Sequence, residues 1–145
     1  MKYTTHATVK EALQLVDVEG IIIPGGWNDD IRPELHELLT TMNQDNKFIA
    51  AICAEPQYLS NTGILDNKRF TTTLTKEILI QNNKKDLFNW DNFIDENVIK
   101  DGHIITAKGR AFIDFGIEIA DYYHLFDDVE YWGTKEENKN RYKGF

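Results

Sequence analysis

The chain has 145 residues, of which 41% are hydrophobic, a size and composition suited to one domain with a substantial core. Its net charge of −8 argues against binding to nucleic acid or to anionic membranes, since both attract basic surfaces. A single cysteine excludes an intramolecular disulfide, and no apolar stretch approaches the length of a membrane span. We therefore expect a soluble, acidic protein of the cytoplasm.

The first half of the chain alternates predicted helices with predicted strands. Residues 8–11, Thr-Val-Lys-Glu, have the spacing of a capping box and open an amphipathic helix. The β-branched run before Pro24-Gly25-Gly26 predicts a buried strand that ends in a loop. Pro33 suits the first turn of a second helix. Residues 48–52, FIAAI, predict another buried strand, and Gly63 suits the end of the helix that follows it.

The second half continues this pattern. Residues 69–73, RFTTT, predict a strand, and residues 98–107 predict a hairpin that turns at Asp101-Gly102. A long apolar helix pattern follows Gly109. Helices alternating with buried strands predict a mainly parallel sheet with helices on both faces, formed by one domain over residues 1–127. Residues 128–145 are predicted to form a polar tail.

Cys53 lies directly after the FIAAI strand, where a helix begins. A strand-to-helix turn displays its residue at the edge of the sheet and offers backbone N–H groups to a developing oxyanion. Such a position favours a nucleophilic thiolate. The alternative is a cysteine that only packs in the core, as many free cysteines do. The position alone leaves both interpretations open.

Four segments together resemble the ThiJ/PfpI superfamily, relatives of the class I glutamine amidotransferases. The resemblance implies a flavodoxin-like α/β sandwich with Cys53 as the catalytic residue of a nucleophile elbow. It also implies an oxyanion and substrate-binding pocket at Gly25, Gly26 and Ala54. The segments that carry it are DVEGIIIPGG from residue 17, KFIAAICAEPQYLSNTGIL from residue 47, KRFTTT from residue 68 and VIKDGHIITAKGRAFIDFGIEIA from residue 98.

The activity that the resemblance implies is that of a hydrolase, an intracellular peptidase or amidase, or of a glyoxalase or deglycase. The substrate would be a small carbonyl or amide compound or a peptide, and no cofactor is implied. The histidines show no metal-ligand spacing, and one cysteine supports no zinc site, so we expect no metal.

The chain departs from the family pattern in ways that bear on catalysis. Family members begin with a strand, a helix and a strand that this chain lacks, and the first of these strands carries an acid that bonds the cysteine. Positions at which many members have a histidine read Ala54 and Thr73, and Glu55 stands in place of a usual glycine. An ionised Glu55 would modulate Cys53 by opposing thiolate formation.

Two functions therefore remain open. The chain is either a cysteine-dependent enzyme or a catalytically impaired member that acts as a redox-responsive, chaperone-like or binding protein. The missing first strands should also leave residues 20–23 as an unpaired strand edge, which predicts a homodimer.

Overall fold

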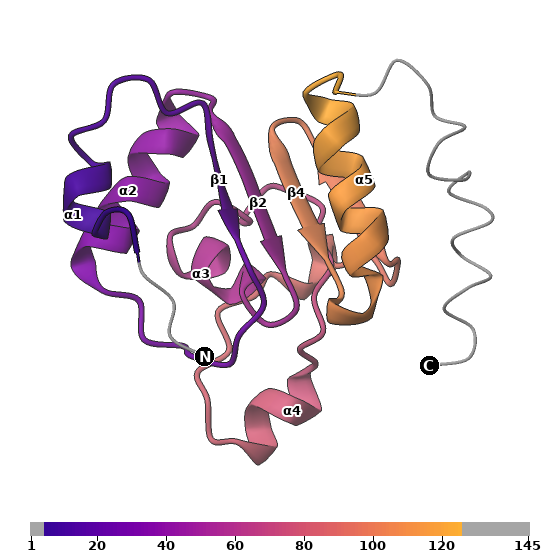
Figure 1. The fold of residues 1–145 in the computed structure, drawn as a ribbon. Helices are drawn as coiled ribbons and strands as arrows, with labels where there is room; N and C mark the ends of the chain where they lie inside the picture. Colours follow the sequence, from indigo (N-terminus) through magenta and orange to yellow (C-terminus); the bar gives the residue numbers. More distant parts are fainter. Residues whose placement is uncertain (1–4, 126–145) are drawn as a thin grey trace.

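The computed structural model describes residues 5–125, which form an α/β fold around a four-stranded sheet (Figure 1). The strand order is β1-β2-β4-β3; β1, β2 and β4 run parallel, and β3 is antiparallel to β4. This mainly parallel sheet between helices confirms the predicted fold class. The strands are β1 (Gly20–Ile23), β2 (Phe48–Ile52), β3 (Val98–Asp101) and β4 (Ile104–Ala107); the helices are α1 (Val9–Ala12), α2 (Pro33–Gln44), α3 (Pro56–Asn61), α4 (Lys76–Gln81) and α5 (Phe112–Tyr122).

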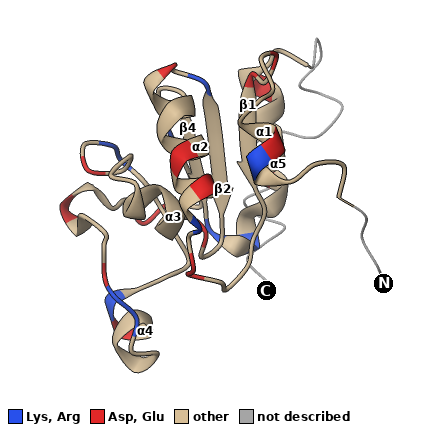
Figure 2. Ribbon diagram, turned by 90° about the vertical axis from the view of Figure 1, so that its left-hand side faces the viewer, with Lys and Arg blue, Asp and Glu red and all other residues tan. Residues whose placement is uncertain are grey.

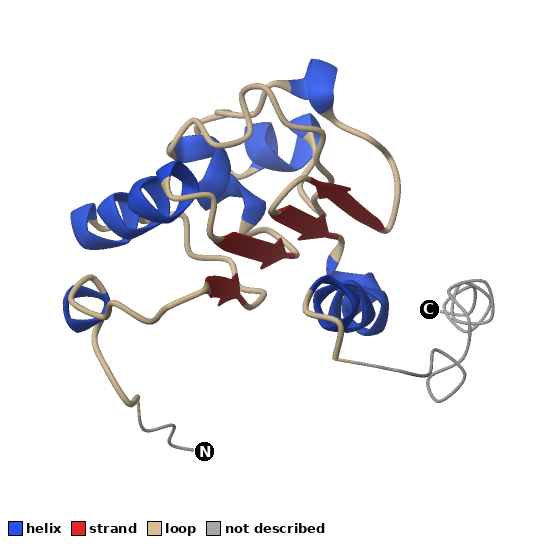
Figure 3. Ribbon diagram, turned by 90° about the horizontal axis from the view of Figure 1, so that it is seen from above, coloured by secondary structure: helices blue, strands red, loops and turns tan. Residues whose placement is uncertain are grey.

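The core lies on both faces of β2, because every residue of this central strand is buried. Ile49 and Ala51 point to the face covered by α2 and α3, where they join a large apolar cluster. Phe48, Ala50 and Ile52 point to the opposite face and pack with α5 (Figure 3). The two-residue alternation of a strand thus divides FIAAI between two cores.

Several local signals in the sequence form the structures they predict. Thr8 and Glu11 form the capping box at the start of α1. Gly63 has φ of 76°, and its N–H donates to the carbonyl of Ser60. The N–H of Ile64 donates to the carbonyl of Leu59, so α3 ends in a Schellman motif.

Two predicted elements are shorter than their patterns suggest. The helix α1 ends at Ala12, about one turn after it begins, and Val16 beyond it is 89% exposed. Residues 69–73 form no strand of the sheet and make one isolated bridge, from Phe70 to Phe93. The reason is that Thr71 and Thr72 direct their hydroxyls to the carbonyls of Glu96 and Cys53, so side chains fix this segment in place of a strand ladder.

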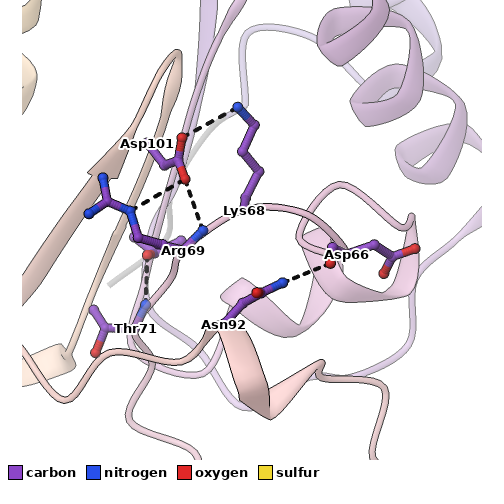
Figure 4. A network of polar contacts seen from close by, with 7 residues as sticks. Asp66, Lys68, Arg69, Thr71, Asn92 and Asp101 are labelled. Atoms are coloured by element: carbon purple, nitrogen blue, oxygen red, sulfur yellow. Dashed lines mark hydrogen bonds and ion pairs between the residues drawn. The ribbon is translucent and has the colours of Figure 1, made fainter.

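The hairpin of β3 and β4 forms as predicted, with Asp101 paired to Ile104 and Gly102 at φ of 65°. Figure 4 shows Asp101 accepting from the backbone N–H of Arg69 at 2.9 Å, with the side chains of Lys68 and Arg69 at 3.4 and 3.7 Å. These contacts lie at the end of the sheet opposite to Cys53, since Ile104 begins β4 and Ala107 ends it beside Ile52.

Charged positions lie on the helices, the loops and the hairpin (Figure 2), and the three parallel strands contain none. The strand β1 lies at one edge of the sheet, and within residues 5–125 it pairs only with β2. This position agrees with the predicted strand edge. The predicted tail, residues 128–145, lies outside the described residues.

Candidate active site around Cys53

Cys53 occupies the turn between β2 and α3, as the sequence predicts. Its φ is 70°, a left-handed conformation that is costly for a residue with a side chain. Three hydrogen bonds hold the turn: the Cys53 N–H donates to the carbonyl of Ala107 at 2.9 Å, and the Cys53 carbonyl accepts from Thr73 N–H and Thr72 Oγ1 at 3.0 and 2.9 Å. The side chain is half-buried, so the thiol is not enclosed by the core.

Two glycines make room for the cysteine side chain. A Cβ added at Gly25 would lie 3.0 Å from the Cys53 Cβ and 3.8 Å from its Sγ. A Cβ added at Gly109 would lie 3.0 Å from the Sγ. The two distances of 3.0 Å are shorter than ordinary contacts, so the position of the Cys53 side chain depends on the absence of side chains at Gly25 and Gly109. The family resemblance implies a role for Gly25, whereas nothing in the sequence indicates the contact of Gly109 with the sulfur.

The predicted oxyanion donors lie around this turn. Within residues 5–125, neither the N–H of Gly26 nor that of Ala54 donates a hydrogen bond inside the protein. Unpaired backbone donors beside a nucleophile are what an oxyanion pocket requires. Of the two glycines, Gly25 is the one in contact with Cys53. Gly26 lies against Glu55, since a Cβ built at Gly26 would overlap the Oε1 atom of Glu55.

Thr73, where many family members have a histidine, lies close to the cysteine. Its Oγ1 accepts a hydrogen bond from the Gly109 N–H at 2.8 Å and lies 3.5 Å from the Cβ position of that glycine. A hydroxyl with a pKa far above neutrality is no general base for a thiol. His103 does not lie beside Thr73, because its Nε2 is hydrogen-bonded to Asn43 Oδ1 at 2.9 Å. Burial lowers the pKa of this histidine.

Glu55 is buried at 4% exposure, and its Oε2 atom accepts no hydrogen bond within the described residues. Burial raises the pKa of this carboxyl, and a hydrogen bond from Gln57 and the charge of Lys84 oppose the shift. The carboxyl therefore favours its neutral form more than an exposed glutamate does. The structure thus places Glu55 in a desolvated position against Gly26.

A groove of about 400 Å³ adjoins the cysteine turn. Thr72 and Thr73, which bind the Cys53 carbonyl, form part of its wall, and Lys108 and Arg110, on either side of Gly109, form another part. The remaining lining residues are Leu74, Thr75, Phe93 and Asp95. No sequence motif indicates these residues, because they come from segments that only the fold brings together.

The described residues contain neither a candidate metal site nor a membrane-spanning helix. No group of three His, Cys, Asp or Glu side chains in this part of the chain could hold a metal ion. No helix among residues 5–125 is long and apolar enough to cross a membrane.

The chain is similar in sequence to curated proteins. The chain is 32% identical over 111 residues to the uncharacterized protein MJ0967 of Methanocaldococcus jannaschii, covering 71% of this chain and 51% of that protein. It is 29% identical to the uncharacterized protease YdeA of Bacillus subtilis, covering 66% and 47%. The chain thus spans about half the length of these curated relatives.

The fold is also that of a solved structure. The crystal structure of Drosophila melanogaster DJ-1beta superposes with a TM-score of 0.64 at 23% identity, covering 79% of this chain and 61% of that one. The sequence model of the DJ-1/PfpI family matches residues 1–122. With the family pattern extending over most of its length and the family fold around Cys53, this chain belongs to the DJ-1/PfpI family.

Proposed function

We propose that the chain is a cysteine-dependent enzyme, with Cys53 as nucleophile toward a small carbonyl or amide compound or a peptide. The observation that carries the proposal is the left-handed turn that holds Cys53 at the carboxyl end of β2, half-exposed and between two glycines. Strain of this kind at a single non-glycine residue is characteristic of functional sites.

In this proposal the Cys53 thiolate adds to the carbonyl carbon of the substrate. The carbonyl electron pair moves to the oxygen, which the free N–H groups of Ala54 and Gly26 stabilise as an oxyanion. With an amide substrate, the C–N bond then breaks, the amine leaves with a proton from solvent, and water hydrolyses the thioester. Glu55 modulates the step, since a neutral carboxyl repels the thiolate less than an ionised one.

The experiment is a comparison of the purified chain with a Cys53→Ser variant. Both are assayed for hydrolysis of fluorogenic peptide and amide substrates and for consumption of glyoxal and methylglyoxal. We expect turnover in at least one assay that the variant lacks, with the two proteins equal in circular dichroism. Equal rates in both proteins would contradict the proposal.

A second candidate is a redox-responsive protein without turnover. It is favoured by Thr73, which supplies no base beside the sulfur. Oxidation of Cys53 to sulfenic or sulfinic acid by peroxide would then be the functional event. Intact-mass measurement after peroxide treatment, compared with the Cys53→Ser variant, detects it, because oxidation of the two methionines adds the same mass to both proteins and oxidation of the single cysteine adds mass only to the wild type. Oxidation at Cys53 together with no turnover in any assay would select this candidate.

A further inference from the structure

We propose that the groove beside Cys53 binds the carboxylate of the substrate through Arg110, so that the preferred substrates are small anionic compounds with a short apolar body. This inference rests on the proposed role of Cys53 as nucleophile. It adds a substrate class, which neither the fold nor the relatives provide.

The groove adjoins the cysteine turn through Thr73. A Cβ built at Gly109, between Lys108 and Arg110, would lie 3.0 Å from Cys53 Sγ and 3.5 Å from Thr73 Oγ1. Thr73 and the two cations that flank Gly109 also line the groove. The groove and the sulfur therefore share Thr73 and the backbone around Gly109 as neighbours.

The charges of the groove favour an anion. Its wall contains two cations, Lys108 and Arg110, and one carboxylate, Asp95. Lys108 is ion-paired with Asp95, and that contact lowers the pKa of Asp95. The charge of Arg110 also lowers the pKa of Asp95. Arg110 forms no ion pair among the described residues, so it acts on Asp95 from a longer distance. The positive charge of Arg110 is thus left without an ion-pair partner in the described part of the protein.

The guanidinium of Arg110 is oriented by one hydrogen bond. Its Nε donates to Asn97 Oδ1 at 3.3 Å, and the side chain is exposed at the groove wall. This bond leaves the two terminal nitrogens for a ligand, and a guanidinium binds carboxylates through two parallel hydrogen bonds. Arg110 would be a specificity-determining residue.

The remaining wall defines the body of the ligand. Leu74 and Phe93 provide apolar surface, and Thr75 provides a hydroxyl. The volume of about 400 Å³ is at the lower end of what small-molecule sites have, roughly 300–1,000 Å³. A carboxylate with a short aliphatic chain suits this space.

The first test uses alkylation of Cys53 by iodoacetate, an anion, and by iodoacetamide, its neutral analogue. In both reactions the sulfur forms a bond to carbon, iodide leaves and the thiol proton goes to solvent. We expect Arg110→Gln to lower the ratio of the iodoacetate rate to the iodoacetamide rate by about two- to fivefold, and high salt to lower the wild-type ratio. Arg69→Gln removes the same charge at the opposite end of the sheet and should leave the ratio unchanged. Equal ratios in the two variants would overturn the proposal.

The second test does not depend on the thiol. Titration with butyrate should shift the amide NMR signals of Thr73 and Gly109, and titration with the neutral butyramide should not. The butyrate shifts should disappear in Arg110→Gln and persist in Arg69→Gln. If Cys53 is inert to both alkylating agents while butyrate binds in this way, the nucleophile proposal fails and the anion site stands. If butyrate causes no shifts, or butyramide causes equal ones, the anion site is refuted.

Discussion

At the scale of single residues, the conformation of Cys53 is the most unusual feature of the described chain that bears on function. Its φ is 70°, and the other non-glycine residues with a positive φ in the described part of the chain are two asparagines and a histidine, Asn46, Asn83 and His124. Asparagine and histidine tolerate this region better than a cysteine does. The hydrogen bonds from Thr72 and Thr73 to the Cys53 carbonyl hold the turn against this cost.

This strain predicts an unusual response to substitution. The Cys53→Gly variant should be more stable than Cys53→Ala by about 1 kcal/mol, because glycine adopts a positive φ without penalty. The free energy of unfolding from urea titration measures the difference. At an ordinary position alanine is the more stable of the two by roughly 0.5–1 kcal/mol, and that order here would contradict the assigned strain.

Burial of Glu55 predicts a dependence of stability on pH. Its pKa is raised in the folded protein above the usual 4.5, so the folded state holds the proton more tightly than the unfolded chain. The protonated Glu55 carboxyl therefore contributes fully to stability below the pKa that it has in the unfolded chain. This contribution is lost as the pH rises through the pKa that Glu55 has in the folded protein.

The Glu55→Gln variant removes this titration. We expect its free energy of unfolding to rise relative to wild type between about pH 4 and about pH 7, as measured by urea titration at several pH values. Glu37→Gln makes the same chemical change on the exposed face of α2 and serves as the control. A difference between Glu55→Gln and wild type that stays constant over this range would refute the raised pKa.

At the scale of elements, the site depends on how closely the end of β4 approaches the end of β2. Gly109 begins the turn that leads into α5, and its backbone lies against the sulfur of Cys53 because the two strands are parallel neighbours. The carboxyl ends of parallel strands meet at one edge of the sheet, which is where α/β proteins generally bind ligands.

The contact predicts that Gly109→Ala displaces the thiol. A methyl group 3.0 Å from Sγ must push the sulfur aside, so alkylation of Cys53 by iodoacetamide should slow and stability should fall by about 1–3 kcal/mol. Gly116→Ala is the matched control, since a Cβ there meets nothing within 4 Å. That variant, on the exposed side of α5, should gain up to about 1 kcal/mol and keep normal alkylation. Unchanged alkylation in Gly109→Ala would contradict the geometry.

At the scale of the whole molecule, the edge of the sheet at β1 bears on assembly. The strand pairs only with β2 among the described residues, and Ile22 on it is 51% exposed. An apolar edge strand with unpaired backbone groups is a template for association with another chain. We therefore predict a homodimer that pairs or covers β1.

Light scattering on the purified chain measures the mass directly. The Ile22→Lys variant should be monomeric, because a charged side chain on an edge strand opposes pairing. Ile80→Lys introduces the same charge at an isoleucine of α4 that is 78% exposed, and it should leave the dimer intact. A wild-type chain that is monomeric at micromolar concentration would refute the prediction.

Elements whose signals are local could be predicted from the amino-acid sequence alone. The capping box at Thr8, the glycine that ends α3 and the apolar run of β2 depend on residues within one turn or one strand, and they form as predicted. The same holds for the position of Cys53, because a strand directly followed by a helix determines where the turn lies. The family resemblance extended this prediction to the fold.

The residues that surround the cysteine, by contrast, come together only through contacts between distant segments of the chain. Residues 69–73 have the composition of a strand, yet hydroxyl bonds to Glu96 and Cys53 hold Thr71 and Thr72 outside the sheet. The burial of Glu55 against Gly26, the contact of Gly109 with the sulfur and the groove at Arg110 join segments distant in the chain. Periodicity and capping report neighbours along the chain, whereas desolvation and van der Waals contact depend on neighbours in space, and these determine the chemistry around Cys53.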